Sequence, residues 1–491
     1  MRQVYRTALG YPRVPLNEQA TPVPDLVSVT AAGVVGNGTS DNPELSQDGR
    51  YVVFESTATN FTAGLDGTRQ VWRKDLATNA LESVSAGPGS NASIAWDGRR
   101  VAFERDGRIY LRDMASAAIT QVATGTRPRL TARADRIAFV ATVGGISQIM
   151  VVDLAGGGVR AVTAGNGPSD QPAISADGRF VAFRSGATDL VPGYAGNSLA
   201  QIFVRDVERG VTALVTQSAA GTPATGASWN PALSGDGGTL SFGSDARDLV
   251  NGKPAAGQAY LAANPLPRPE KTGYWYRTGT GGGQGWAMER WGNQAYVGGL
   301  AYDAQGRSQW LAGSCTLSGL TCSGMLTGGP AFSLVTAEGG ASTDLVVGGT
   351  AWQTLSPFPV GGTRTTGYAG LPQAGWWYEA GAGNGVGYFL DTDSQPQADG
   401  SIAQIGYLSV LGYDATGARV WQSSQATLAA DLSFSGTLMQ YAGGAPFGAT
   451  TGASQPSSSA IGPVRMTFDG TDRARITLPG GRNADLVRFR F

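Results

Sequence analysis

Residues 43–56 read PELSQDGRYVVFES, and this phrase decides the fold because four later segments repeat its pattern. In each copy a short strand pattern leads into a turn, and a run of alternating apolar side chains follows. Self-similarity at a period of tens of residues indicates a repeat architecture. The other copies are ASIAWDGRRVAFER from Ala92, PRLTARADRIAFVA from Pro128, PAISADGRFVAFRS from Pro172 and PALSGDGGTLSFGS from Pro231.

Each repeat has the pattern of four antiparallel strands. An Asp-Gly pair, as at Asp48 and Gly49, favours the tight turn that joins the first two strands. A third strand follows a loop, as in QVWRKDL from Gln70, and a fourth completes the unit. Four antiparallel strands per repeat make one propeller blade. The third copy has Ala134 and Asp135 in place of Asp-Gly, so we expect a blade there with a different turn.

The five phrases resemble TolB-type β-propeller repeats of bacterial envelope and secreted proteins. The shared motif is S-x-D-G-[RK]-x-[IVL]-[AV]-F, and the resemblance covers about residues 26–264. It implies a propeller fold and is nearly silent about function, because propellers serve many functions.

Closure of the ring is read from the two ends of the repeat region. The fifth repeat has a third strand, QAYLAAN from Gln258, followed by LPRP instead of a fourth strand. DLVSVTAAG from Asp25 resembles the fourth strands, so we expect it to complete the fifth of five blades. An alternative remains, because Gln3–Arg6 resembles Gln70–Arg73: the start can form a partial blade, which leaves six blades or a shortened ring open.

Composition excludes several functional classes. With 15% charged residues and a net charge of −1, the chain has no basic surplus for phosphates, so we expect no nucleic-acid partner. It contains no histidine, which excludes Ser-His-Asp and Cys-His chemistry and imidazole metal ligands. The glycine runs GTGGGQG and GAGNGVG precede no helical pattern, so they do not predict a phosphate site. We expect no cofactor and no metal.

The two cysteines bear on the compartment. No apolar run of about 18 residues predicts a membrane-spanning helix, and residues 1–15 contain no apolar signal region. The chain is therefore cytosolic or has lost an export signal. A hairpin turning at Ser318-Gly319 would place Cys315 and Cys322 opposite one another, which favours a disulfide over two reduced thiols. A disulfide indicates an oxidising compartment, so we expect a secreted, periplasmic or cell-surface protein.

The second half carries a different duplication. We assign residues 1–265 to the propeller and the proline-rich residues 266–272 to a linker. GYWYRTGTGGGQGWAMER from Gly273 matches GWWYEAGAGNGVGYFLDT from Gly375, which divides the rest into copies 273–371 and 372–491. Alternating strands predict antiparallel barrels or sandwiches, so the whole chain is all-β. The copies resemble the tryptophan-rich G-W-W-Y domains of secreted proteobacterial proteins, which implies a fold and no activity.

Aromatic side chains are the first candidate contact residues. Trp275, Trp286, Trp376 and Trp377 pack in a core or offer flat faces for sugars or peptides, and a ligand-filled barrel is the third interpretation. Tyr194 lies in the long insert 187–201 of the propeller, a candidate contact loop.

Carboxylate pairs are the second candidate. Asp391 with Asp393, and Asp245 with Asp248, could in principle hydrolyse a glycoside without histidine. Their contexts read as loops, so solvated loop residues are the simpler interpretation.

These observations lead to one main functional hypothesis. We expect a non-catalytic binding or assembly protein of the envelope or extracellular space, with the propeller as interaction platform and a protein partner or self-association. The alternatives are a carbohydrate-binding protein that uses its tryptophan-rich repeats on polysaccharide, and a carboxylate-dependent hydrolase.

Overall fold

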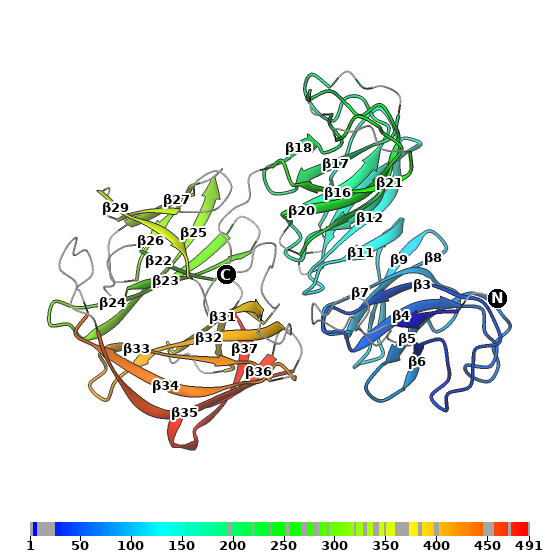
Figure 1. Ribbon diagram of the computed structural model, residues 1–491. Coiled ribbons are helices and arrows are strands. Elements are labelled where there is room, and N and C mark those ends of the chain that lie inside the picture. Colours follow the sequence, from blue (N-terminus) through cyan, green and yellow to red (C-terminus); the bar gives the residue numbers. More distant parts are fainter. Residues whose placement is uncertain are drawn as a thin grey trace, which may run out of the picture. The chain divides into compact units, whose positions relative to one another are not determined.

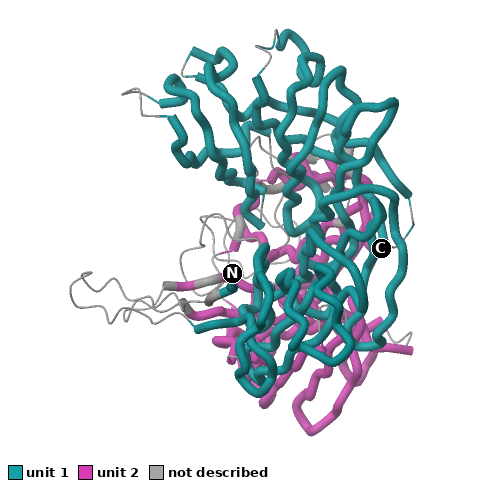
Figure 2. The backbone as a smooth tube through the Cα atoms, turned by 90° about the vertical axis from the view of Figure 1, so that its right-hand side faces the viewer, with its two compact units in different colours: residues 1–266 teal, residues 267–491 magenta. Residues whose placement is uncertain are grey.

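A computed structural model shows the architecture of the chain (Figure 1). It describes residues 3–6, 25–154, 156, 158–194, 196, 199–218, 220–235, 237–250, 256–266, 273–277, 284–291, 294–318, 321–327, 331–336, 343–347, 350–358, 373–381, 385–396, 402–429, 431–444, 456–469 and 473–489. Two compact units divide it, residues 1–266 and 267–491 (Figure 2). Most of the expected linker, residues 267–272, lies outside the described residues. No helix in the described ranges is long and apolar enough to cross a membrane.

Unit 1 is a five-bladed β-propeller. Its first four sheets have four strands each, and the fifth has three. The first sheet is β3 (Ser40–Leu45), β4 (Tyr51–Ser56), β5 (Gln70–Asp75) and β6 (Leu81–Ser83), and the second is β7 (Ser90–Ile94), β8 (Arg100–Arg105), β9 (Arg108–Asp113) and β10 (Ile119–Thr124). The third is β11 (Thr126–Leu130), β12 (Arg136–Val143), β13 (Ile146–Asp153) and β14 (Val159–Ala161). The fourth is β15 (Ser169–Ile174), β16 (Phe180–Ser185), β17 (Gln201–Asp206) and β18 (Val211–Leu214), and the fifth is β19 (Ser228–Leu233), β20 (Thr239–Ser244) and β21 (Gln258–Ala263).

The repeated phrase forms the turn between the first two strands of each sheet. In the first blade, the Asp48 carboxylate accepts a hydrogen bond from the Arg50 N–H at 3.0 Å, and Gly49 has a φ of 72°. Glycine adopts this left-handed conformation without steric cost. In the third blade Ala134 adopts it with a φ of 52°, and Asp135 pairs with Thr131. The prediction of a blade with a different turn is therefore confirmed.

Apolar clusters join each sheet of unit 1 to the next. Strand alternation sends neighbouring side chains to opposite faces, so each inner sheet contributes to two clusters. In the fourth sheet, Val181 and Phe183 pack toward the third sheet, while Phe180 and Ala182 pack toward the fifth. Among the described residues, no such cluster joins the fifth sheet to the N-terminal strands.

The N-terminal segment differs from the expected closing strand. β1 (Tyr5–Arg6) and β2 (Asp25–Leu26) pair with each other in a separate two-stranded sheet, and neither is paired with β21. Val4 and Val27 pack on the first blade. The expectation that residues from Asp25 complete the fifth sheet is wrong in this structure, and the partial blade was the better alternative. The physical reason is that this segment finds its hydrogen-bond partners within the N-terminal sheet and the first blade.

Unit 2 consists of two closed antiparallel barrels of eight strands each. The first contains β22 (Gly273–Arg277), β23 (Gly285–Trp291), β24 (Gln294–Tyr302), β25 (Ser308–Ser318), β26 (Thr321–Met325), β27 (Ala331–Thr336), β28 (Thr343–Val347) and β29 (Thr350–Pro357). The second contains β30 (Gly375–Glu379), β31 (Gly387–Pro396), β32 (Ile402–Tyr413), β33 (Arg419–Thr427), β34 (Phe434–Ala442), β35 (Ser457–Asp469), β36 (Arg473–Thr477) and β37 (Asn483–Arg488), with the short 3-10 helix η1 (Pro479–Gly481) before β37. β22 pairs with β29 and β30 with β37, which closes each barrel.

Candidate functional site

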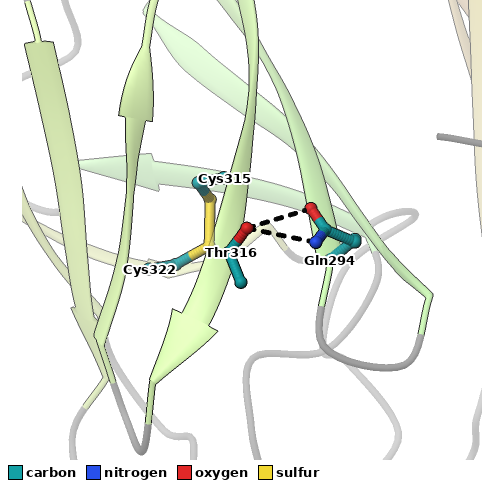
Figure 3. Close-up of a disulfide and its surroundings, with 4 residues drawn as sticks. All are labelled: Gln294, Cys315, Thr316 and Cys322. Atoms are coloured by element: carbon teal, nitrogen blue, oxygen red, sulfur yellow. Dashed lines mark hydrogen bonds between the residues drawn. A yellow bond between two sulfur atoms is a disulfide. The ribbon is translucent and has the colours of Figure 1, made fainter.

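Cys315 and Cys322 form a disulfide between β25 and β26 (Figure 3). Their Cα atoms are 5.5 Å apart, and both side chains lie in the core of the first barrel. The register differs from the sequence expectation: Cys322 is opposite Leu317, and Cys315 is opposite Gly324. The bond is therefore diagonal, because the hairpin turns one residue later than Ser318-Gly319. Beside it, Thr316 hydrogen-bonds with the side-chain amide of Gln294.

The four candidate tryptophans are buried, with 1–3% of each residue exposed. Trp275 and Trp286 belong to the core of the first barrel. Trp377 is among the largest fully buried side chains and lies beside the Arg488 guanidinium, 5.0 Å from its ring centre. Trp376 instead lies in a cluster that includes residues of both barrels. These rings pack against protein, so their faces are not open to a sugar in this structure.

The cluster around Trp376 is an interface in which equivalent residues of the two barrels exchange equivalent contacts. The Trp310 indole N–H donates to Gly412 O at 2.9 Å, and Trp421, its counterpart, donates to Ala301 O at 3.0 Å. Likewise the Tyr274 N–H donates to the Asp391 carboxylate, and the Trp376 N–H donates to the Glu289 carboxylate. Such reciprocity is the mark of an isologous interface, here within one chain.

One ion pair breaks the symmetry of this interface. Arg488 is paired with the Glu289 carboxylate of the other barrel, and both side chains are about 1% exposed or less. At the position equivalent to Arg488 the first barrel has Pro357, because Trp275 is opposite Pro357 as Trp377 is opposite Arg488. Arg488 also donates to the carbonyl oxygens of Gln373 and Ala374. The pair therefore links the barrels on one side only.

The two carboxylate pairs lie in different settings. Asp391 and Asp393 lie in β31 and are buried, which corrects the interpretation of both as solvated loop residues. Asp391 accepts the Tyr274 N–H at 2.8 Å, and Asp393 accepts from the Gln395 amide at 3.2 Å. Burial also raises the pKa of Tyr274 well above its ordinary value. In the propeller, Asp248 accepts the Thr225 N–H, a structural bond in a loop.

Tyr194 is half-buried in the insert 187–201. Its ring packs edge-on against Phe203, with ring centres 5.5 Å apart, and burial raises the pKa of its hydroxyl. Asp189 at the start of the insert accepts the Asn166 N–H at 2.9 Å. The described part of the insert is thus held against the fourth blade, and Tyr194 presents only part of its ring to solvent.

The outward face of the fifth sheet is the largest departure from the repeat pattern. Leu261 in β21 is 78% exposed, whereas Val204, at the same position in β17, is completely buried. The two positions correspond because Leu261 is opposite Ser241 as Val204 is opposite Ala182. Ala259 and Ala263 on the same face are exposed as well. The other face of the sheet packs on the fourth blade through Leu240 and Phe242.

The edge of β21 is the second part of this candidate site. β21 is hydrogen-bonded to β20, and among the described residues it has no partner on its other edge. The missing fourth strand is evident in the sequence, but Gln258 and Leu261 were not among the predicted contact residues. A signal was present: β5, β9, β13 and β17 all end in Asp, and β21 ends in Ala263. Those aspartates accept N–H groups of the turn to a fourth strand, as Asp75 does from Ala77 at 2.9 Å.

Comparisons with known proteins add structural likeness at low sequence identity. No protein-family description matches the chain, and no curated protein matches it. A solved structure assigned as TolB from Agrobacterium tumefaciens is 19% identical, with a TM-score of 0.34, over 50% of this chain and 95% of that one. TolB from Acinetobacter baumannii is 15% identical, with a TM-score of 0.29, over 55% and 78%. An acylaminoacyl peptidase of Pyrococcus horikoshii is 12% identical, with a TM-score of 0.32, over 76% and 57%.

Proposed function

We propose that this chain is a non-catalytic binding or assembly protein whose propeller is the platform for a protein partner. The observation that carries the proposal is the outward face and edge of the fifth sheet. An exposed strand edge is a ready template for pairing with another chain, and soluble proteins usually protect such edges. A large apolar side chain exposed beside such an edge offers a partner apolar surface to bury. β21 combines both features, since Leu261 is 78% exposed and the edge is unpaired among the described residues.

Unit 2 supports the same proposal by what its aromatic residues do. The indole N–H groups of Trp310 and Trp421 donate to carbonyl oxygens across the interface between the barrels. The candidate stacking residues are buried there or in the barrel cores, which removes the observation behind the carbohydrate alternative. We therefore propose a structural role for unit 2, in addition to the binding role of the propeller.

A secreted, periplasmic or cell-surface location is part of the proposal. The Cys315–Cys322 disulfide fits an oxidising compartment, where such bonds persist.

Site-specific photo-cross-linking tests the platform. A photoreactive phenylalanine analogue would replace Leu261 in the organism that carries the gene, and Val143 would be the matched control because it is an apolar strand residue that is 53% exposed. We expect a discrete cross-linked protein from position 261 and none from position 143. The same products from both positions, or none from position 261, would overturn the proposal.

A further inference from the structure

One contact occurs four times among the described residues of the propeller. In each copy a valine and the serine or threonine after it directly follow a strand, β6, β14 or β18 at the end of a blade and β2 in the N-terminal sheet: Val27-Ser28, Val84-Ser85, Val162-Thr163 and Val215-Thr216. The valine N–H donates to the carbonyl oxygen of a second residue, at 2.8 to 2.9 Å. The hydroxyl oxygen accepts the N–H of that same residue. These residues are Val4, which directly precedes β1, and Val71, Ile149 and Ile202 in third strands, with distances of 3.1, 3.0, 2.8 and 3.1 Å to the hydroxyl.

A glutamine next to this second residue recognises the hydroxyl in three of the four copies. The Thr163 hydroxyl donates to Gln148 Oε1 at 2.6 Å, and the Thr216 hydroxyl donates to Gln201 Oε1 at 2.6 Å. Ser28 donates to Gln3 in the same way. A serine or threonine hydroxyl can accept and donate at once, which a valine in its place cannot do. The contact therefore distinguishes a hydroxyl side chain from an apolar one of the same shape.

β21 has the glutamine and the neighbouring residue that the third strand supplies to this contact, but among the described residues it has no valine and serine or threonine opposite them. It begins with Gln258 and Ala259, as β17 begins with Gln201 and Ile202, and the register agrees because Ala259 is opposite Gly243 as Ile202 is opposite Arg184. Gln201 is fully buried, whereas Gln258 is exposed. The Gln258 amide makes a long hydrogen bond of 3.5 Å to Ala256 O.

We propose that the edge of β21 binds an extended segment of a partner protein and selects one in which valine precedes serine or threonine. This inference rests on the proposed function and names the partner chemistry of its site. Addition of a strand to an exposed edge uses main-chain hydrogen bonds for affinity and side-chain pockets for specificity. The valine of the added strand would lie on the face of Leu261, since Val215 packs in the same cluster as Val204.

The N-terminal segment that follows β2 carries one Val-Ser pair, but other residues of the propeller already bind it. Ser28 is bound by Gln3 and Val4, as above. The Lys74 ammonium, which is buried, donates to Val29 O at 3.1 Å and to Thr30 O at 3.2 Å. Asn79 donates to Ala31 O at 2.8 Å. A second copy of the chain offers the same occupied strand, so a segment of another protein is the occupant that the contacts favour.

Peptide binding to the full chain tests the selection. The probe is a fluorescent peptide with the sequence of residues 211–217, VTALVTQ, and the matched peptide has valine in place of its second threonine. Fluorescence anisotropy should show binding of the probe and about 30-fold weaker binding of the matched peptide, the effect of two net hydrogen bonds. In Gln258→Leu the preference should fall to about fivefold, because the Ala259 N–H can still donate to the hydroxyl. In Gln121→Leu, a control at an exposed strand glutamine, the full preference should remain.

Three results would overturn the inference. They are equal affinity for both peptides, a preference that is unchanged in Gln258→Leu, and occupation of the edge by the chain itself. For the last, a variant with Asp25→Cys and Leu261→Cys places cysteines at the positions equivalent to Ala213 and Val204, which are opposite one another. A disulfide within one chain identifies its own strand as the occupant, and one between chains identifies a second copy. If peptide maps show neither disulfide, the result supports a different protein as the occupant of the edge.

The two proposals can fail separately. Loss of peptide selectivity with the cross-link at position 261 retained would contradict the strand preference alone. Loss of that cross-link would contradict the platform itself.

Discussion

Both units of this protein are built from repeats, and they differ in how the repeats cover one another's apolar faces and hydrogen-bonding groups. In unit 1 the sheets follow one another in chain order, so each packs on the next and the last outward face has no neighbour among the described residues. In unit 2 the two barrels exchange equivalent contacts, as when Trp310 binds Gly412 and Trp421 binds Ala301. Repeats in a row leave ends to be capped or bound, whereas a two-fold pair covers its own faces.

The difference also shows in residue choice. The interior blades keep large apolar residues on their outward faces, such as Phe180 and Val204. The fifth blade has Thr239 and Ser241 on that face, with Leu261 as the exception. A polar outer face is what a terminal repeat needs for solubility. An exposed leucine at position 261 is therefore unexpected on a capping face and is expected on a binding surface.

The largest expected effect separates an interior blade face from the terminal one. Val204→Asp places an unpaired charge where no surface is exposed, and we expect it to destabilise unit 1 by more than about 4 kcal/mol. Leu261→Asp changes the equivalent position on the open face and should change stability by less than about 0.5 kcal/mol. Chemical denaturation followed by hydrogen exchange in β17 and β21 measures both. A similar loss in both variants would show that the fifth face is covered.

The second prediction concerns the asymmetry of the barrel interface. Glu289→Gln leaves the buried Arg488 guanidinium without its carboxylate, and we expect a loss of about 3 kcal/mol. Asp391→Asn, at the equivalent position of the second barrel, should lower stability by less, about 1 kcal/mol, because the interface bond of Asp391 is to a backbone N–H. Tryptophan fluorescence in a urea titration reports on unit 2, which contains eight of the eleven tryptophans. Adding Arg488→Met to Glu289→Gln should recover part of the loss; no recovery would show that the charge is not the cause.

The smallest effect is a pH dependence in the turns that the fifth blade lacks. Burial alone would raise the pKa of Asp75, but the Arg50 guanidinium and the N–H groups of Ala77 and Thr78 outweigh it and lower that pKa to about 2. A depressed carboxyl pKa stabilises the fold above the unfolded value, near 4, and the contribution is lost as the pH falls from about 4 to 2. Solvent near this ion pair limits the contribution to roughly 1 kcal/mol.

Asp75→Asn tests this dependence. It should remove that part of the slope of stability against pH in acid and leave stability between pH 6 and pH 8 lower but flat. Unfolding midpoints at half-unit pH steps measure it. A variant slope equal to that of the wild type would show that Asp75 does not titrate in this range.

Local patterns in the sequence predicted most of the repeat structure. Asp-Gly turns and period-two alternation predicted the blades. The third blade also forms a four-stranded sheet, although Ala134 replaces the Asp-Gly pair in its turn. The G-W-W-Y duplication predicted two similar β domains, and closed barrels are what the structure contains. These features follow from interactions between residues close in the chain.

Long-range partners were harder to predict. The segment from Asp25 has the pattern of a fourth strand, but Gln3 and Lys74 bind it, and β2 is paired with β1 and not with β21. The cysteines were expected opposite one another, and a turn one residue later made their bond diagonal. Asp391 and Asp393 looked like loop residues because nothing nearby in the sequence shows that both are buried in β31, where Asp391 accepts the Tyr274 N–H of the first barrel.

By itself the sequence determined that the chain is all-β, that five sheets repeat before residue 266, and that two copies of another domain follow. It could do so because periodicity and turn residues act over a few positions. Only the tertiary structure decided which strand pairs with β2, that the four candidate tryptophans of unit 2 are buried, and that Leu261 is exposed. Those outcomes depend on which distant groups satisfy each strand edge and apolar face, and a local pattern is the same whether its face is covered or open.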